Sequence, residues 1–287
     1  MIGVKNVSYL IGLIPALGWG VQPLILKKIK GNPANEILGT GIGALIIGLI
    51  SLMFTTDTIS TKTFIISFVS GLFWVVGQVG QYVAFNKIGV SKTMPLSTGL
   101  QLIGTSLIGV IFFNEWPGLT NRIIGFFVIL LIIFGAILTT RGEGSKPGAI
   151  KEGIILLAST SIGYWVYSAI PKVVDADGIN IFLPQMLGVF LGAVIFALFK
   201  NRRVFTEKKS WQAIAVGFTF SISSLAYIFA AQRIGVASAF IITQLNVVIA
   251  TLGGILILHE RKSRKELINT LIGLALIIAG SIITIFL

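Results

Sequence analysis

Cysteine is absent from this chain of 287 residues, and histidine occurs once. The absence of cysteine excludes disulfide bonds and thiolate metal sites. The sequence also has no cluster of carboxylates and no ligands at the spacing of a metal site, so a catalytic centre is not expected. We therefore predict neither enzymatic activity nor a bound cofactor or metal ion.

Charge is also scarce. Asp, Glu, Lys and Arg together make up 11% of the residues, whereas 55% are hydrophobic and the mean hydropathy is +0.95. A soluble protein of this length exposes far more charge. Apolar runs near 20 residues recur, and each is about long enough to cross roughly 30 Å of hydrocarbon. The expected solvent is therefore a lipid bilayer, in which backbone hydrogen bonds close within helices.

These runs predict an all-α integral membrane protein with ten transmembrane helices. The expected spans cover about residues 7–26, 33–54, 64–86, 92–113, 121–140, 152–171, 179–199, 210–232, 236–258 and 267–287. The net charge is +12, and the basic residues lie in short loops between the spans. A nucleic-acid partner needs a folded basic surface with stacking aromatics, so none is predicted.

The two halves of the chain carry related residues at a constant spacing of about 145. The matched pairs include Thr98 with Thr243, Gln101 with Asn246, and Glu115 with Glu260. We predict a first five-helix repeat at residues 1–140, a linker at 141–151 and a second five-helix repeat at 152–287. Because five is odd, the second repeat enters the membrane from the opposite side, as in the inverted repeats of secondary transporters.

Positive charge is distributed unequally between the loops. When the loops are assigned alternately to two faces, one face holds 5 Lys and Arg residues and the other holds 17. By the positive-inside rule, the face with more positive charge is cytoplasmic. The prediction is a multi-pass protein of the plasma membrane, with both termini outside and the linker in the cytoplasm.

Polar and aromatic side chains recur near the middle of several spans, and neutral amides, hydroxyls and aromatic faces suit a neutral polyol. The substrate-binding candidates are Trp19, Gln22, Trp74, Gln78, Gln81, Thr98, Gln101, Tyr164, Tyr167, Gln185, Tyr227, Thr243 and Asn246. Buried polar groups in hydrocarbon tend to face a cavity or the bundle interior. Each candidate could instead serve only as an interhelical hydrogen bond, worth about 0.6 kcal/mol on average.

Carboxylates are the remaining candidates. Glu115 and Glu260 end equivalent spans on opposite faces, where they could gate, carry a proton or simply be solvated at the surface. No Asp or Glu lies well inside any expected span, so a proton carrier would have to be one of these two or a group that the sequence does not identify. Gly99, after Pro95, could allow a local break in the fourth span.

Several blocks of this chain resemble one transporter family. The most specific is GVSKTMPLSTGLQLIGTSLIGVIFFNEW from Gly89, and LIPALGWG from Leu13, FLPQMLG from Phe182 and TLGGILILHE from Thr251 agree with it. They are similar to the bacterial glucose/ribose porter family of the drug/metabolite transporter superfamily. The resemblance covers essentially the whole chain. It implies ten helices in two halves of five and monosaccharide uptake, commonly proton-coupled.

The combined prediction is a secondary transporter that imports a neutral monosaccharide, glucose first and ribose second, by alternating access. The expected partners are the sugar, H+ and the lipid bilayer; no oligomeric state is predicted. Two alternatives stay open. One is a uniporter of the same sugars, and the other is an exporter of amino acids or other metabolites from the same superfamily.

Overall fold

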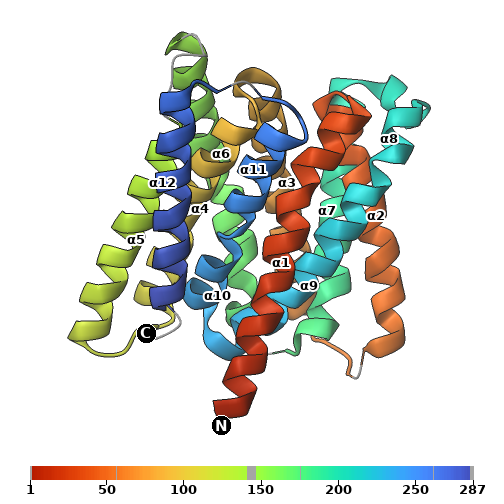
Figure 1. The fold of residues 1–287 in the computed structure, drawn as a ribbon. Helices are drawn as coiled ribbons and strands as arrows, with labels where there is room; N and C mark the ends of the chain where they lie inside the picture. The colour runs from red at the N-terminus through yellow and green to blue at the C-terminus, as the bar shows by residue number, and fades with distance from the viewer. Residues whose placement is uncertain (1, 56, 141–146, 175, 261, 285–287) are drawn as a thin grey trace.

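The computed structural model describes residues 2–55, 57–140, 147–174, 176–260 and 262–284 (Figure 1). Within these ranges every regular element is a helix. The predicted all-α class is therefore confirmed. Most of the predicted linker, residues 141–146, lies outside the described residues, and residues 147–151 form the start of a helix.

The long helices agree with the expected spans to within a few residues at most ends. In chain order the elements are α1 (Ile2–Ile29), α2 (Pro33–Ser51), η1 (Leu52–Phe54), α3 (Thr61–Ile88), α4 (Val90–Phe112), α5 (Leu119–Thr140), α6 (Pro147–Val173), α7 (Gly178–Lys200), η2 (Arg202–Phe205), α8 (Lys208–Gln212), α9 (Ile214–Ile234), α10 (Val236–Thr243), α11 (Asn246–Leu256) and α12 (Arg264–Thr284), where η marks a short 3₁₀ turn.

Nine segments of the described residues are long and apolar enough to cross a membrane. They correspond to the first nine expected spans. The tenth span coincides with α12, which has 21 residues but begins with Arg264, Lys265 and Glu266. The multi-pass membrane class is thus confirmed, with nine to ten long apolar helices.

The outer surface of the bundle is apolar, as a bilayer requires. Along α5, the side chains of Ile123, Phe126, Phe127 and Phe134 are all exposed. A water-soluble monomer rarely exposes a continuous apolar surface of this kind. These side chains are therefore expected to contact lipid.

The helices run side by side, with α5 and α12 at one edge of the bundle and α2, α7 and α8 toward the other (Figure 1). The packed pairs are α5 with α12, α2 with α7, α3 with α6, and α1 with α9, while α4 contacts α6, α10 and α11. The first residues of α1 and the last described residues of α12 lie at the same end of the bundle (Figure 1). The centre is therefore surrounded by α1, α3, α4, α6, α9, α10 and α11.

A single glycine joins α3 to α4, and a second one joins α9 to α10. Gly89 has φ +81° and Gly235 has φ +93°. An L side chain is strained in this left-handed region, whereas glycine enters it readily. Each sharp connection places the start of the next helix directly beside the end of the previous one.

Close helix contacts depend on paired glycines. Gly71 of α3 packs against Gly188 of α7, and Gly43 of α2 packs against Gly217 of α9. A Cβ at Gly71 would overlap the carbonyl oxygen of Gln185. Small residues allow helix backbones to approach closely in membranes, where packing drives association.

The ninth expected span, 236–258, is interrupted in the structure. It forms α10 and α11, separated at Gln244 and Leu245, and the backbone N–H groups of these two residues donate to the carbonyls three residues earlier. This tightened 3₁₀ geometry breaks the α-helical ladder locally. The break lies in the second half, whereas α4 continues through Gly99, so the suggested break in the fourth span is wrong.

Candidate functional site

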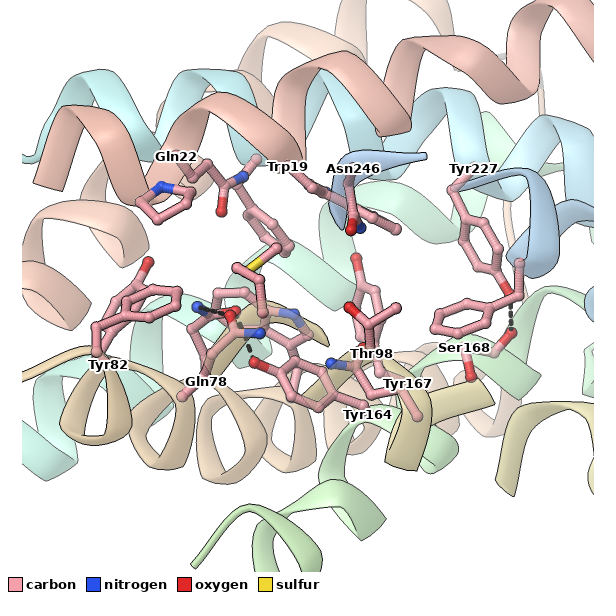
Figure 2. Close-up of a pocket in the computed structure, with 18 residues that line it drawn as sticks. Trp19, Gln22, Gln78, Tyr82, Thr98, Tyr164, Tyr167, Ser168, Tyr227 and Asn246 are labelled. Atoms are coloured by element: carbon pink, nitrogen blue, oxygen red, sulfur yellow. Dashed lines mark hydrogen bonds between the residues drawn. The ribbon is translucent and has the colours of Figure 1, made fainter. Parts of the chain in front are cut away.

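A cavity lies at the centre of the bundle between α1, α3, α4, α6, α9, α10 and α11 (Figure 2). Its lining residues are Trp19, Gln22, Pro23, Trp74, Gln78, Gln81, Tyr82, Phe85, Met94, Thr98, Gln101, Tyr164, Tyr167, Ser168, Phe220, Tyr227, Phe240 and Asn246. Eleven of the thirteen substrate-binding candidates are in this set. The two others are Gln185 and Thr243.

Helical periodicity explains why these side chains meet. In α3, Trp74, Gln78 and Gln81 follow one another at the three- and four-residue steps that keep side chains on one helix face. Tyr82 and Phe85 continue the same stripe for one more turn. The face of α3 that carries the stripe is directed toward α6 and α4, so the stripe forms one wall of the cavity.

A continuous chain of hydrogen bonds runs along this wall. The Tyr164 hydroxyl donates to Oε1 of Gln78 at 3.0 Å, and Nε2 of Gln78 donates to Oε1 of Gln81 at 3.0 Å. Nε2 of Gln81 then donates to the Ser97 hydroxyl at 2.9 Å, and Nε2 of Gln101 donates to the same hydroxyl at 2.8 Å. The chain links α6, α3 and α4, so these amides are held in fixed orientations.

Aromatic rings form much of the remaining surface. The ring centroids of Trp74 and Phe220 are 4.0 Å apart, and Tyr167 lies 6.3 Å from each of them. Trp19 and Tyr227 form a second contact at 5.8 Å. Such rings present large apolar faces while Tyr and Trp keep one polar group available. They can therefore cover the C–H face of a polyol.

On the α1 and α11 side of the cavity, three buried groups have no hydrogen-bond partner within the described protein. They are Nε1 of Trp19, Nε2 of Gln22 and Oδ1 of Asn246. Gln22 and Trp19 come from α1, and Asn246 lies near them on the same side of the cavity (Figure 2). Buried polar groups are normally paired. Two donors and one acceptor therefore remain available to a ligand whose hydroxyls both donate and accept.

The cavity is neutral and narrow. None of its lining residues is Asp, Glu, Lys or Arg, and its volume is about 50 Å³. At roughly 10–15 Å³ for each water molecule, this space accommodates a few waters. A larger ligand requires the lining side chains to move apart.

Gln185 and Thr243 lie outside the cavity. Gln185 of α7 is fully buried and its Nε2 donates to the Ser70 hydroxyl of α3 at 3.0 Å. The Thr243 hydroxyl donates to the carbonyl oxygen of Phe240, one turn earlier in its own helix, at 2.6 Å. Each side chain thus donates a hydrogen bond within the protein, while Oε1 of Gln185 has no partner among the described residues.

The seven lining residues that were not among the candidates are Pro23, Tyr82, Phe85, Met94, Ser168, Phe220 and Phe240. Three of them extend stripes that did supply candidates. Tyr82 and Phe85 follow the α3 stripe, and Ser168 lies four residues after Tyr164. Continuing each stripe by one turn would have found these three. Met94 and Phe240 carry no polar signal in the sequence, because an apolar residue in a membrane helix can equally face lipid.

Glu115 follows α4 and binds the start of α10. Its carboxylate accepts the backbone N–H groups of Val236 at 2.6 Å and Ala237 at 2.8 Å. The first N–H groups of a helix have no partner within the helix, and a carboxylate there also complements the helix dipole. Glu115 therefore ties the end of α4 to the start of α10.

Glu260 makes the corresponding contact at the start of α4. Its carboxylate accepts the backbone N–H groups of Val90 at 2.8 Å and Ser91 at 3.0 Å. The two glutamates therefore act reciprocally: each follows one helix of the pair and caps the first residues of the other. Neither borders the cavity, and their gating or coupling role stays a prediction.

Burial raises the pKa of the Glu115 carboxyl above its ordinary value, while the N–H groups of Val236 and Ala237 oppose that shift. The pKa of Lys262, which follows α11, is lowered by burial, and the nearby Glu266 opposes the change. Lys262 donates to the Thr139 carbonyl at 3.1 Å and to the Thr270 hydroxyl at 2.9 Å. It thereby ties α5 to α12.

Replacing Glu115 with alanine is expected to lower the thermal midpoint of the purified protein in detergent. The substitution leaves two N–H groups of α10 without their acceptor, and losing a side-chain cap costs about 1–2 kcal/mol. Tryptophan fluorescence during heating measures the change. Glu152→Ala is the control, because Glu152 pairs with Lys87 at the exposed surface and such pairs contribute little. Equal shifts in the two variants would contradict a capping role.

Comparison with known proteins identifies the family. Residues 10–287 match the family described as sugar transport protein. A provisionally named sugar uptake protein of Lactobacillus helveticus is 48% identical over 96% of this chain and 99% of its own. A provisionally named ribose uptake protein of Latilactobacillus sakei is 43% identical over 99% of each chain.

A solved crystal structure has a similar fold. It superposes with a TM-score of 0.75 at 17% sequence identity and covers 97% of this chain and 98% of its own. At that identity the likeness shows the fold alone. The family match and the full-length relatives confirm the family expected from the sequence motifs, which is one of transporters and not of enzymes. This chain belongs to the sugar transport protein family.

Proposed function

We propose that this protein is a secondary transporter that imports a neutral monosaccharide by alternating access. The observation that carries the proposal is the central cavity, whose lining combines amides, hydroxyls and aromatic rings without a charged side chain. A neutral sugar pairs its hydroxyls with the amides and covers the rings with its C–H face. An amino acid would require partners for its two opposite charges, so the cavity favours the sugar over the exporter alternative.

Glucose is the first candidate substrate and ribose the second. The order follows the motif resemblance of GVSKTMPLSTGLQ, from Gly89, to glucose-type members. The blocks GYWVYSAIP, from Gly163, and NEWPG, from Asn114, resemble ribose-type members more. Relatives of this chain carry the names of sugar and ribose uptake proteins. Both sugars offer several neutral hydroxyls to Gln22, Asn246 and the amide chain on α3.

Two five-helix halves in inverted orientation are the proposed basis of alternating access. In the repeat, α1 of the first half corresponds to α6 of the second, and α3 corresponds to α9. Exchanging these helices converts the contact of α1 with α9 into the contact of α6 with α3, and both contacts are present in the structure. The reciprocal caps by Glu115 and Glu260 exchange in the same way. These correspondences support a pseudo-two-fold relation about the cavity.

Transport requires the cavity to change size. A volume of about 50 Å³ is too small for a monosaccharide. We propose that the helices around the cavity move apart on one membrane face at a time. The 3₁₀ turn between α10 and α11 is a candidate for part of this motion, because such turns inside a long helix often mark hinges.

The proposed orientation places the first residues of α1 and the end of α12 outside the plasma membrane. It rests on the excess of Lys and Arg in the loops of the opposite face, which holds 17 of the 22 such residues. The linker 141–151 is then cytoplasmic. Because cysteine is absent, a cysteine introduced near this linker can test the orientation with an impermeant thiol reagent on an otherwise unaltered chain.

Labelled glucose or ribose is expected to enter proteoliposomes that contain the purified protein, and the initial rate is expected to saturate with sugar concentration. Protein-free liposomes from the same lipid are the control. A panel of neutral monosaccharides, with competition by unlabelled sugars, ranks the substrates. If no member of the panel enters faster than in the control, the sugar-transport proposal is wrong.

A further inference from the structure

A buried carboxyl lies one layer away from the cavity. Glu36 is the fourth residue of α2, and only 3% of its surface is exposed. Its Oε2 atom has no hydrogen-bond partner within the described residues. A buried carboxylate is costly unless it is paired or takes up a proton. Glu36 therefore combines burial with the capacity to bind a proton.

The nearest cation does not form an ion pair with Glu36. Lys27 of α1 interacts electrostatically with it, but Nζ of Lys27 donates to Oδ1 of Asn86 at 2.6 Å. Lys27 can thus moderate the charge of Glu36 without neutralising it.

Two hydroxyls connect Glu36 to the cavity. Thr40, one turn later in α2, donates to the Glu36 carbonyl at 2.7 Å, and its hydroxyl lies 3.1 Å from the Tyr82 hydroxyl. Tyr82 is also one of the residues that line the cavity. Glu36 also interacts electrostatically with Tyr82. The Thr40 hydroxyl thus binds the backbone carbonyl of Glu36 and not its carboxyl, and the observation that relates the carboxyl to the cavity is its electrostatic interaction with Tyr82, a lining residue.

The titratable groups around Glu36 come from two helices. They are Lys27 of α1 and Tyr82 of α3 within the described part of the chain. Toward α8, the acidic side chain is Glu207, and it accepts a hydrogen bond from the neighbouring Asn35 at 2.7 Å. Among the described residues, the charged group that acts on the Glu36 carboxyl is thus Lys27 and not a second carboxylate that would compete for the same proton.

Packing alone does not require an acid at this place. At the spacing of 145 residues, the position that matches Glu36 in the second half is Ile181, which is fully buried. A carboxylate in the first turn of a helix does gain from the helix dipole. That gain is available equally to an exposed residue, so it does not account for the burial of Glu36.

We propose that Glu36 is the proton-binding carboxyl of this transporter, which acts as a sugar–proton symporter. The inference rests on the proposed sugar transport. In the cycle, the Glu36 carboxylate takes up one proton to become the neutral acid, and the loaded protein changes conformation. The proton then leaves to the cytoplasmic side, which regenerates the carboxylate. The neutral form removes the electrostatic cost of moving a buried charge between α1 and α3.

The test compares two transport modes in proteoliposomes with labelled glucose and labelled ribose. Counterflow, in which internal unlabelled sugar exchanges for external labelled sugar, needs no net proton movement. Accumulation driven by an inward proton gradient does need it, and at one proton per sugar a gradient of about one pH unit supports about tenfold accumulation. Glu36→Gln keeps the size of the side chain but binds no proton.

We expect Glu36→Gln to retain counterflow and to lose gradient-driven accumulation, together with the external alkalinisation that accompanies sugar entry. Glu36→Asp keeps a carboxyl and is expected to retain part of the accumulation. This second variant keeps the proposal testable if Glu36→Gln does not fold. Glu152→Gln, at an exposed surface position, is the matched control and should behave as the unmodified protein.

Normal accumulation by Glu36→Gln would overturn the assignment. So would a Glu36→Asp variant that retains counterflow but loses gradient-driven accumulation. If the unmodified protein shows counterflow but no accumulation, it is a uniporter; the symport inference is then wrong while sugar transport stands. If it shows no counterflow with either sugar, the proposed function and the inference fail together.

Discussion

Asn246→Ala is expected to reduce sugar uptake about tenfold without lowering the amount of folded protein in the membrane. Oδ1 of Asn246 has no partner within the described protein and borders the cavity, so its removal leaves no protein group unpaired. A lost hydrogen bond to substrate amounts to about 0.5–1.5 kcal/mol, and the upper value corresponds to about tenfold. Initial rates of labelled sugar uptake, normalised to protein in the liposomes, measure the effect.

Thr243→Val is the matched control for this prediction. Thr243 lies three residues before Asn246, is fully buried and donates to the carbonyl of Phe240 instead of bordering the cavity. Valine has a similar shape, so uptake is expected to stay near that of the unmodified protein. Equal losses in both variants would mean that Asn246 acts through helix packing and not through the substrate.

Gly71→Val is expected to abolish accumulation of the folded protein. A Cβ at this position would overlap the carbonyl oxygen of Gln185 and lie 2.8 Å from the backbone nitrogen of Val189. Because the clash involves backbone atoms, α3 and α7 would have to separate along their length, and the loss of tight packing removes what drives helix association in a membrane. Size-exclusion chromatography of the detergent-solubilised protein shows whether a folded species remains.

Gly148→Val provides the control for helix propensity. Gly148 is the second residue of α6, and no atom lies within 4 Å of a Cβ placed there. Valine replaces glycine in a helix in both variants, but only Gly71 lies at a helix–helix contact. A normal chromatographic profile for Gly71→Val would show that the α3–α7 contact is more adaptable than the structure indicates.

Tyr82 illustrates how far a sequence pattern could reach. Trp74, Gln78 and Gln81, which the sequence places on one helix face, all line the cavity, because residues three and four apart lie side by side on a helix. The same rule leads to Tyr82 and Phe85. It does not lead to Met94 or Phe240, since their apolar side chains carry no sign of which neighbour they contact.

Glu36 illustrates a different limit. In the sequence it lies near the beginning of an apolar run, where a carboxylate is expected to reach the membrane surface. Its burial arises because α2 packs chiefly against α7, α9 and α8, and Lys27 of α1 and Tyr82 of α3 interact electrostatically with it. Those contacts join residues that are far apart along the chain, so no local pattern contains them.

Thr243 and Asn246 show where the sequence pattern and the tertiary structure give different answers. The two residues are three apart in one expected span, but the helix is interrupted between them at Gln244 and Leu245. Of the two, only Asn246 borders the cavity. The sequence by itself determined the membrane class, the approximate helix spans and most of the polar residues that line the cavity, because hydrophobic length and helical periodicity are local properties. Tertiary structure alone decided which polar groups share one cavity and which carboxyl is buried, because the rotation of each helix about its axis depends on packing against helices distant in the chain.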